Sequence, residues 1–106
     1  MNKKKYYTYL LLTERNTYYC GYTDDIEHRY IKHISGTGAK YTRANKPLNI
    51  AYLAEFKTKS EAMKEECRIK KLTRDEKEEL VKNFKNVRLR RIVKGILLEA
   101  QELQCA

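Results

Sequence analysis

The sequence predicts one small α+β domain, with a three-stranded mixed or antiparallel sheet flanked by helices and an amphipathic helix at the C-terminus. At 106 residues the chain can close one modest core but not two. Two β-prone segments come first, a third apolar segment follows a basic stretch, and only helix-forming sequence remains after it. We therefore expect a domain over residues 1–84 and a helix over residues 85–106.

The first two strands should form an antiparallel hairpin. Residues 6–13 are rich in Tyr, Thr and Leu, and residues 17–23 repeat that composition after a polar break at residues 14–16. Aromatic and β-branched residues favour strands, and a short polar break between two such runs is typical of a hairpin turn.

The first helix is predicted over residues 25–35. Residues 24–27 have the form of a capping box, and Gly36 stands where a helix end favours left-handed backbone. Residues 36–47 hold two glycines and the only proline, which predicts an ordered or semi-ordered loop. This loop contains no acid, and its cations are Lys40, Arg43 and Lys46.

The third strand is predicted over residues 48–56, where both faces carry apolar side chains. A strand buried on both sides and central in the sheet explains this pattern. Capping boxes at residues 58–61 and 73–76 then open two helices, with a short break at residues 72–73.

The last segment predicts an amphipathic helix. Beyond Asn86, apolar residues recur at three- and four-residue spacing, with an interruption at Gly95. This helix would either pack back on the domain or pair with another chain, which would make a homodimer.

The charge balance indicates nucleic acid as the first partner to consider. Lys and Arg number 23 against 14 acids, a formal net charge of +9. Such an excess favours polyanions through counterion release. Membrane binding is not expected, because no apolar run approaches the length of a spanning helix.

The chain is predicted to work in a reducing cytoplasm. Residues 1–5 are basic but lead into residues 6–9, which lack the apolar run and cleavage site of a secretory signal. The three cysteines, Cys20, Cys67 and Cys105, form no Cys-x-x-Cys or Cys/His pair. Neither a disulfide framework nor a zinc site is therefore suggested.

Tyr19 and Gly21 project to one face of the second strand, because side chains alternate along a strand. Glycine inside a strand is usually kept where a ligand or another backbone comes close, and the alternative is a bulge. Tyr9 lies in the facing strand. Each tyrosine taken singly is explained as a favoured strand former.

Arg29 and His33 are four residues apart and lie on one side of the first helix, at the edge of its apolar stripe. A guanidinium placed there can fork onto two phosphate oxygens. The alternative for Arg29 is a surface pair with Asp25. An exposed or capping role is the commoner case for a histidine such as His33.

Glu66 is the most informative single residue, because it falls on the same helical face as the apolar Ala62 and Ile69. A carboxylate in an apolar stripe is costly unless a cation compensates its charge. That cation is either a bound metal or Lys70, which stands at i+4 in the favourable order.

In their order and approximate spacing, these residues resemble the GIY-YIG nuclease family, and most closely its small stand-alone members. The matching set is Tyr9, Tyr19-x-Gly21, Arg29, His33 and Glu66. The similarity runs from about residue 6 to residue 80. Only the tyrosine of the first name motif is retained, and Tyr22 stands where some repair nucleases of the family carry a lysine. Lys40 is the candidate replacement for that lysine.

The resemblance implies a sheet of the GIY-YIG type and an endonuclease that hydrolyses phosphodiester bonds with one divalent metal. Glu66 would hold Mg²⁺ or Mn²⁺, and Arg29 would neutralise the developing charge. The general base stays open among Tyr9, Tyr19 and His33.

The expected partner is duplex or branched DNA, in repair or recombination. Substrate contacts are expected from the strand glycine and from the loop cations, namely Gly21, Lys40, Arg43 and Lys46. These contacts would position the backbone without reading sequence. The alternative function is a non-catalytic nucleic-acid-binding module that keeps the fold.

Overall fold

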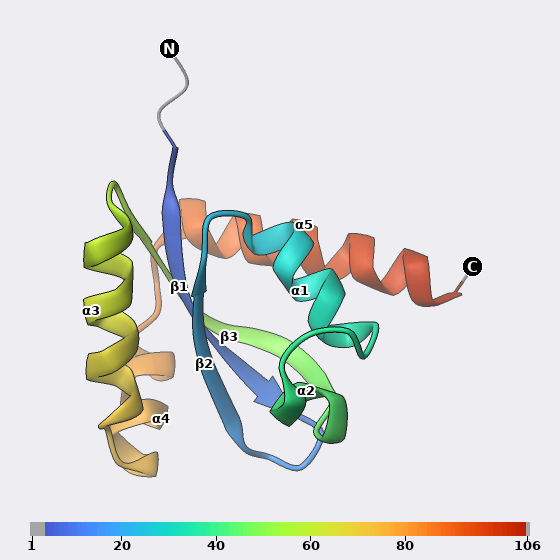
Figure 1. The fold of residues 1–106 in the computed structure, drawn as a ribbon, viewed down its shortest axis with the longest axis horizontal. Helices are drawn as coiled ribbons and strands as arrows, with labels where there is room; N and C mark the ends of the chain where they lie inside the picture. The colour runs from blue at the N-terminus through green and yellow to red at the C-terminus, as the bar shows by residue number, and fades with distance from the viewer. Residues whose placement is uncertain (1–3, 106) are drawn as a thin grey trace.

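Three antiparallel strands form one sheet, in which β1 lies between β2 and β3. The computed structural model describes residues 4–105. The elements along the chain are β1 (Tyr6–Thr13), β2 (Tyr18–Thr23), α1 (Ile26–Ile34), α2 (Lys40–Ala44), β3 (Pro47–Phe56), α3 (Lys59–Lys70), α4 (Arg74–Lys82) and α5 (Val87–Cys105). The predicted α+β class and the hairpin are confirmed, and the sheet is antiparallel throughout (Figure 1).

The prediction that the third strand is central is wrong, because β3 pairs only with β1 and forms an edge of the sheet. Its apolar side chains serve two different layers. Ile50 and Leu53 belong to the core that α1 and α5 complete, whereas Tyr52 packs in the cluster beneath α3 and α4. A strand is apolar on both faces whenever helices cover both faces of its sheet, and an edge strand is no exception.

Helices cover the sheet on two sides (Figure 1). On one side the side chains of α1 and α5 pack with β1 and β3, and the buried members of this core include Tyr9, Tyr30, Leu53, Val93 and Ile96. On the other side α3 and α4 cover a smaller cluster built around residues of β1, β2 and α3.

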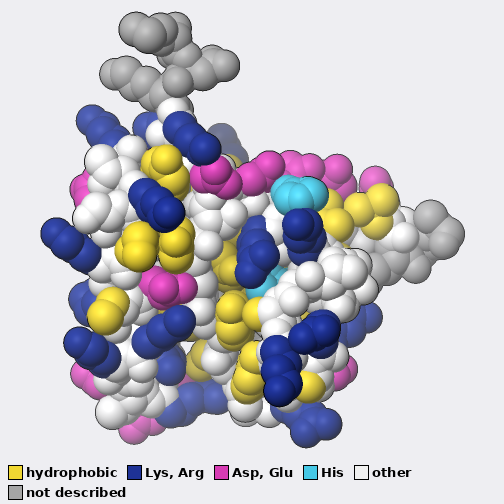
Figure 2. All heavy atoms as spheres, in the orientation of Figure 1, with side chains coloured by type: hydrophobic (Ala, Val, Ile, Leu, Met, Phe, Trp, Pro, Cys, Tyr) yellow, Lys and Arg dark blue, Asp and Glu magenta, His cyan; other side chains and the backbone are white. Residues whose placement is uncertain are grey.

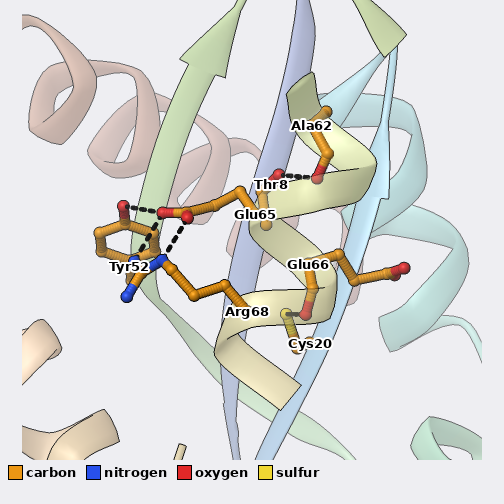
Figure 3. Close-up of polar contacts among 7 residues, drawn as sticks. All are labelled: Thr8, Cys20, Tyr52, Ala62, Glu65, Glu66 and Arg68. Atoms are coloured by element: carbon orange, nitrogen blue, oxygen red, sulfur yellow. Dashed lines mark hydrogen bonds and ion pairs between the residues drawn. The ribbon is translucent and has the colours of Figure 1, made fainter. Parts of the chain in front are cut away.

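Polar contacts attach α3 to the sheet at two positions about one turn apart, Ala62 and Glu65 (Figure 3). The buried Thr8 hydroxyl of β1 donates to the Ala62 carbonyl at 2.7 Å. The Tyr52 hydroxyl of β3 donates to the Glu65 carboxylate at 3.0 Å, and the Arg68 guanidinium holds the same carboxylate through two nitrogens. The rotation of α3 about its axis is thereby set, and with it the direction of every other side chain on the helix.

The first helix begins one residue later than predicted. Asp25 is the N-cap, and its carboxylate accepts the His28 N–H at 3.1 Å. The following basic loop is partly wrong as a prediction, because α2 forms inside it. This five-residue helix has no side-chain cap and buries only Thr42, so it lacks the apolar periodicity by which helices are found in a sequence.

Thr73 and Glu76 form the predicted capping box of α4, and the break before it is confirmed. At α3 the box is incomplete. The Thr58 hydroxyl oxygen accepts the Glu61 N–H, but the Glu61 carboxylate accepts the Thr58 hydroxyl instead of the backbone N–H.

The predicted interruption of the last helix at Gly95 is wrong, because α5 runs unbroken from Val87 to Cys105. A glycine in a helix costs about 1 kcal/mol. Burial of a single aliphatic side chain stabilises the fold by about 1.5–3 kcal/mol, and α5 buries several such side chains against β3 and α1. This helix therefore packs back on the domain.

Within the part of the chain that the structure describes, no helix is both long and apolar enough to span a membrane. Cys20 is buried and Cys67 is exposed, and both are free thiols. The side chain of Cys105 lies outside the described residues, as do residues 1–3, on which the expectation about a secretory signal partly depends.

Candidate active site

A cleft of about 530 Å³ lies between the β1–β2 hairpin, the start of α1 and the exposed side of α3. Its lining contains four tyrosines and charged residues of both signs. The lining residues are Lys4, Tyr6, Tyr9, Tyr19, Gly21, Tyr22, Thr23, Asp24, Arg29, Lys59 and Glu66. Five predicted site residues, from four different elements, therefore meet in one cleft.

Tyr9 projects from the central strand, and its side chain is almost entirely buried. Gly21 stands directly opposite in β2. A Cβ at Gly21 would lie 2.5 Å from the Tyr9 hydroxyl oxygen, so only glycine leaves room for this ring. The pairing of β1 with β2 is continuous here, which excludes the bulge as the reason for the glycine.

His33 lies behind Tyr9 instead of at the edge of the core, and only 1% of it is exposed. Its Nε2 is 2.9 Å from the Tyr9 hydroxyl oxygen, and its Nδ1 is 2.7 Å from Oγ1 of Thr42. The expectation of an exposed or capping histidine is therefore wrong. This burial has no signal in the sequence around His33, because the cover comes from α2 and from Gly38, which lies against the ring.

Burial determines the protonation states of Tyr9 and His33 at neutral pH. It raises the pKa of Tyr9 to about 12, although the nearby Arg29 guanidinium opposes the shift. It lowers the pKa of His33 to about 4, and the Arg29 charge acts in the same direction. At neutral pH the site thus holds an intact Tyr9 hydroxyl against a neutral imidazole.

The Arg29 guanidinium faces the tyrosines. Its interaction with the Tyr9 hydroxyl is the main cause that raises its pKa, and Tyr19 adds to it. Among the described residues the ion pairs include none between Arg29 and Asp25. Asp25 instead caps α1. The surface-pair alternative for Arg29 is therefore wrong, and its charge is directed at the cleft.

Tyr19 packs its ring edge against His33, with ring centroids 5.3 Å apart, and stacks on Tyr41 at 6.0 Å with an angle of 18°. Tyr41 is 40% exposed and extends the aromatic wall outward from the cleft. Sequence reasoning missed Tyr41, because it lies on the short helix α2 that the sequence did not reveal.

Glu66 reaches the cleft from α3. Its carbonyl accepts a long contact of 3.9 Å from the Cys20 thiol, while its side chain points away from the polar cluster around Glu65 (Figure 3). The Glu66 side chain is 21% exposed, so it lies at the margin of the apolar face and not inside it. Its ion pair with Lys70 is long, at 3.7 Å, and the lysine side chain is 56% exposed. Such a pair contributes well under about 1 kcal/mol.

The donor chemistry of the cleft fits a hard divalent cation that is shared with a substrate. Mg²⁺ is commonly bound through one or two carboxylates, several waters and substrate phosphates. Glu66 supplies one such carboxylate, and the Asp24 carboxylate is paired with Lys4 at 2.8 Å. No group of three His, Cys, Asp or Glu side chains converges in the described part of the chain. The residues therefore do not fit a metal held by the protein alone.

The loop cations lie outside this cleft. Lys40 and Arg43 are exposed on α2, and Lys46 precedes β3. The cations that do line the cleft besides Arg29 are Lys4 and Lys59. Lys40, predicted to replace the lysine missing after the second motif, is therefore not among the residues that line the cleft. Lys and Arg side chains are numerous on the face of the molecule shown in Figure 2.

The family model of the GIY-YIG catalytic domain matches residues 5–79. The chain therefore belongs to the GIY-YIG family, a nuclease family with nucleic acid as its substrate class. The described helix α5 lies beyond the matched segment.

Among its relatives are small proteins described only as UPF0213 proteins. One from Enterococcus faecalis is 48% identical over 85 residues, which cover 78% of this chain and 97% of that protein. UPF0213 protein RBAM_000440 of Bacillus velezensis is 43% identical over 81 residues, or 76% of this chain and 82% of that one. The solution NMR structure of EF2693 from E. faecalis is similar, with a TM-score of 0.54 and 45% identity over 78% of this chain and 88% of that one.

Proposed function

We propose that this protein is a metal-dependent endonuclease that hydrolyses phosphodiester bonds in duplex or branched DNA, in repair or recombination. The observation that supports this most is the cleft itself. A buried tyrosine with a histidine behind it, a free guanidinium and a half-buried carboxylate face one space of about 530 Å³. Tyr9, Arg29 and Glu66 come from three separate elements, β1, α1 and α3.

Each residue has a distinct role in this proposal. Arg29 stays charged at any working pH and neutralises charge that develops on the phosphate oxygens. Glu66 holds Mg²⁺ or Mn²⁺, which would polarise a phosphate oxygen and the leaving group when bound. Gly21 keeps the wall of the cleft open beside Tyr9. Lys4 and Lys59 at the cleft, with Lys40, Arg43 and Lys46 farther out, hold the backbone of the nucleic acid.

The geometry favours Tyr9 over Tyr19 as general base, because its hydroxyl lies 2.9 Å from His33 Nε2. A water gives its proton to the Tyr9 oxygen as the Tyr9 proton moves to His33. Burial raises the pKa of Tyr9 and lowers that of His33, so a phenolate and an imidazolium formed before the attack are disfavoured. The proton therefore moves together with the attack of water, and His33 acts through Tyr9 as a positioning and proton-accepting partner.

The homodimer expected through the C-terminal helix would need a surface that the core does not use. The apolar stripe of α5 is buried against β3 and α1, which leaves Val87, Leu98 and Leu103 exposed. Light scattering of the full chain and of a Leu98→Glu variant tests this contact, because a dimer through α5 should become a monomer.

A cleavage assay on a panel of structured DNAs, with and without Mg²⁺ or Mn²⁺, tests the function. Cleavage should require the metal and should disappear in Glu66→Gln and Arg29→Ala. The matched control is Glu65→Gln, which changes the neighbouring carboxylate that faces Tyr52 and Arg68 instead of the cleft. If the unchanged protein binds DNA but cuts none of the panel, and both variants bind equally well, the non-catalytic binding module is correct.

A further inference from the structure

The Thr42 hydroxyl lies between a ring nitrogen and a carbonyl. Its Oγ1 is 2.7 Å from Nδ1 of His33 and 3.0 Å from the Ala39 carbonyl oxygen, and Thr42 is 2% exposed. A hydroxyl has one proton to donate, whereas a carbonyl oxygen can only accept. If the hydroxyl donates to Ala39, its lone pairs face Nδ1, and the imidazole must carry its proton on Nδ1.

The other arrangement leaves the groups mismatched. A Thr42 hydroxyl that donated to Nδ1 would bring two oxygens, its own and that of Ala39, to 3.0 Å with no proton between them. His33 would then carry its proton on Nε2 and donate to Tyr9. The Tyr9 hydroxyl would then have to turn its proton away from His33 and toward the cleft, where the Arg29 guanidinium offers only donors.

With the proton on Nδ1, every group finds a complementary partner. Thr42 donates to Ala39, His33 Nδ1–H donates to Thr42, and Tyr9 donates to His33 Nε2. The buried side-chain polar atoms of the described residues are all hydrogen-bonded in the structure. The Tyr9 oxygen keeps a lone pair for the cleft.

The segment that carries Thr42 is fitted to the ring. A Cβ at Gly38 would lie 2.6 Å from His33 Nδ1 and 3.1 Å from Cγ, so this glycine lets the backbone close over the imidazole. Ala39 is the N-cap of α2, and Thr42 follows one turn later. The short helix α2 thus holds a single hydroxyl against a single nitrogen.

We propose that Thr42 is a positioning residue, which together with the Ala39 carbonyl fixes His33 as the Nδ1–H tautomer and so keeps Nε2 free to take the Tyr9 proton. The inference rests on the proposed nuclease function for its consequence, but the tautomer itself is a property of the resting protein. In catalysis the Tyr9 proton moves to Nε2 and gives an imidazolium, whose Nδ1–H stays bonded to Thr42. The water proton replaces it on Tyr9, so the proton count balances.

The consequence of removing the hydroxyl follows from the same hydrogen-bond count. In Thr42→Val the Nδ1–H would be buried without a partner, whereas Nε2–H could still donate to Tyr9. The tautomer should therefore change to Nε2–H, which cannot accept the Tyr9 proton. We expect kcat to fall roughly 100-fold, the lower end of what general-base catalysis contributes, with KM unchanged because Thr42 is buried away from the cleft.

The test is the nitrogen-15 NMR spectrum of the ring nitrogens of His33 in the full chain, without metal or DNA. The unchanged protein and Thr42→Ser should show the proton on Nδ1, and Thr42→Val should show it on Nε2. Thr8→Val is the matched control, because Thr8 is an equally buried hydroxyl that donates to a helix carbonyl on the other side of the sheet. It should leave the proton on Nδ1.

Two results would overturn the inference. One is a proton on Nε2 in the unchanged protein, which needs no variant and holds even if Thr42→Val fails to fold. The other is a proton that stays on Nδ1 in a folded Thr42→Val. If the tautomers behave as expected but no DNA is cut, the proposed nuclease function fails while the role of Thr42 in fixing the ring stands.

Discussion

His33 should make the stability of this protein depend on pH in a range where few other groups titrate. Its pKa is lowered to about 4 in the folded chain by burial, against an ordinary value of 6.5. The unfolded chain therefore binds a proton more readily than the folded chain between these two values. Stability from the neutral buried ring is fully present above pH 6.5 and is lost as the pH falls through the folded pKa.

The size of the effect follows from the two pKa values. The linkage relation gives a loss of ~2 kcal/mol in the free energy of unfolding between pH 7.5 and pH 5, and ~3 kcal/mol by pH 4. The carboxylates with lowered pKa values, Glu55 and Glu65 among them, add their own loss at lower pH. The window from pH 7.5 to pH 5 therefore isolates the histidine.

Urea unfolding followed by circular dichroism at half-unit pH steps measures this loss. The unchanged protein and His28→Gln should lose ~2 kcal/mol across the window, because His28 is exposed on α1. His33→Gln should start less stable and show a nearly flat profile. A flat profile in the unchanged protein, or a full slope that persists in His33→Gln, would refute the buried neutral imidazole.

Three further outcomes test other parts of the structure. Gly21→Ala should lower the free energy of unfolding by about 1–3 kcal/mol and kcat by about 100-fold, because the new Cβ must push the Tyr9 hydroxyl aside by roughly 1 Å. Gly95→Ala is the matched control, because a Cβ there meets nothing within 4 Å, and it should be neutral or stabilising by up to ~1 kcal/mol in urea unfolding. Ile96→Ala should cost ~3 kcal/mol in the same assay, because this side chain is buried where α5 meets the core, and a loss under ~0.5 kcal/mol would show that α5 is not part of the fold. DNA affinity measured by fluorescence anisotropy should fall linearly with the logarithm of salt concentration, with a slope about 1 smaller in magnitude for Arg43→Ala, and salt-independent binding would contradict the electrostatic contacts.

The local elements of this fold could be predicted because their signals are local. The hairpin follows from composition and a polar break, and the start of α4 follows from Thr73 and Glu76, whose reciprocal contacts lie within one turn. The place of β3 in the sheet could not be predicted from its own residues. Its two apolar faces indicate that helices cover both sides of the strand, not which strands are its neighbours. The covering helices α3 and α5 come later in the chain.

The candidate site likewise contains residues that the sequence predicts and an environment that it does not. Tyr9, Tyr19, Arg29 and Glu66 were predicted from a pattern of residue types in order, and the structure brings them to one cleft. The environment of His33 was not predicted, since its cover comes from a helix too short to leave a periodic signal. The pattern identified the residues, but only the packing shows which of them are neutral at working pH.

Two glycines show how the sheet and the loop serve the same pair of side chains. A Cβ at Gly21 would collide with Tyr9, and a Cβ at Gly38 would collide with His33, the two residues whose side chains meet at 2.9 Å. One glycine lies in a strand and the other in the segment before α2, so neither local context alone explains both. Each is placed where a side chain would separate the hydroxyl from the imidazole. The close contact between Tyr9 and His33 is therefore enforced from opposite sides, and this double constraint makes it the part of the site that the chain is built most closely around.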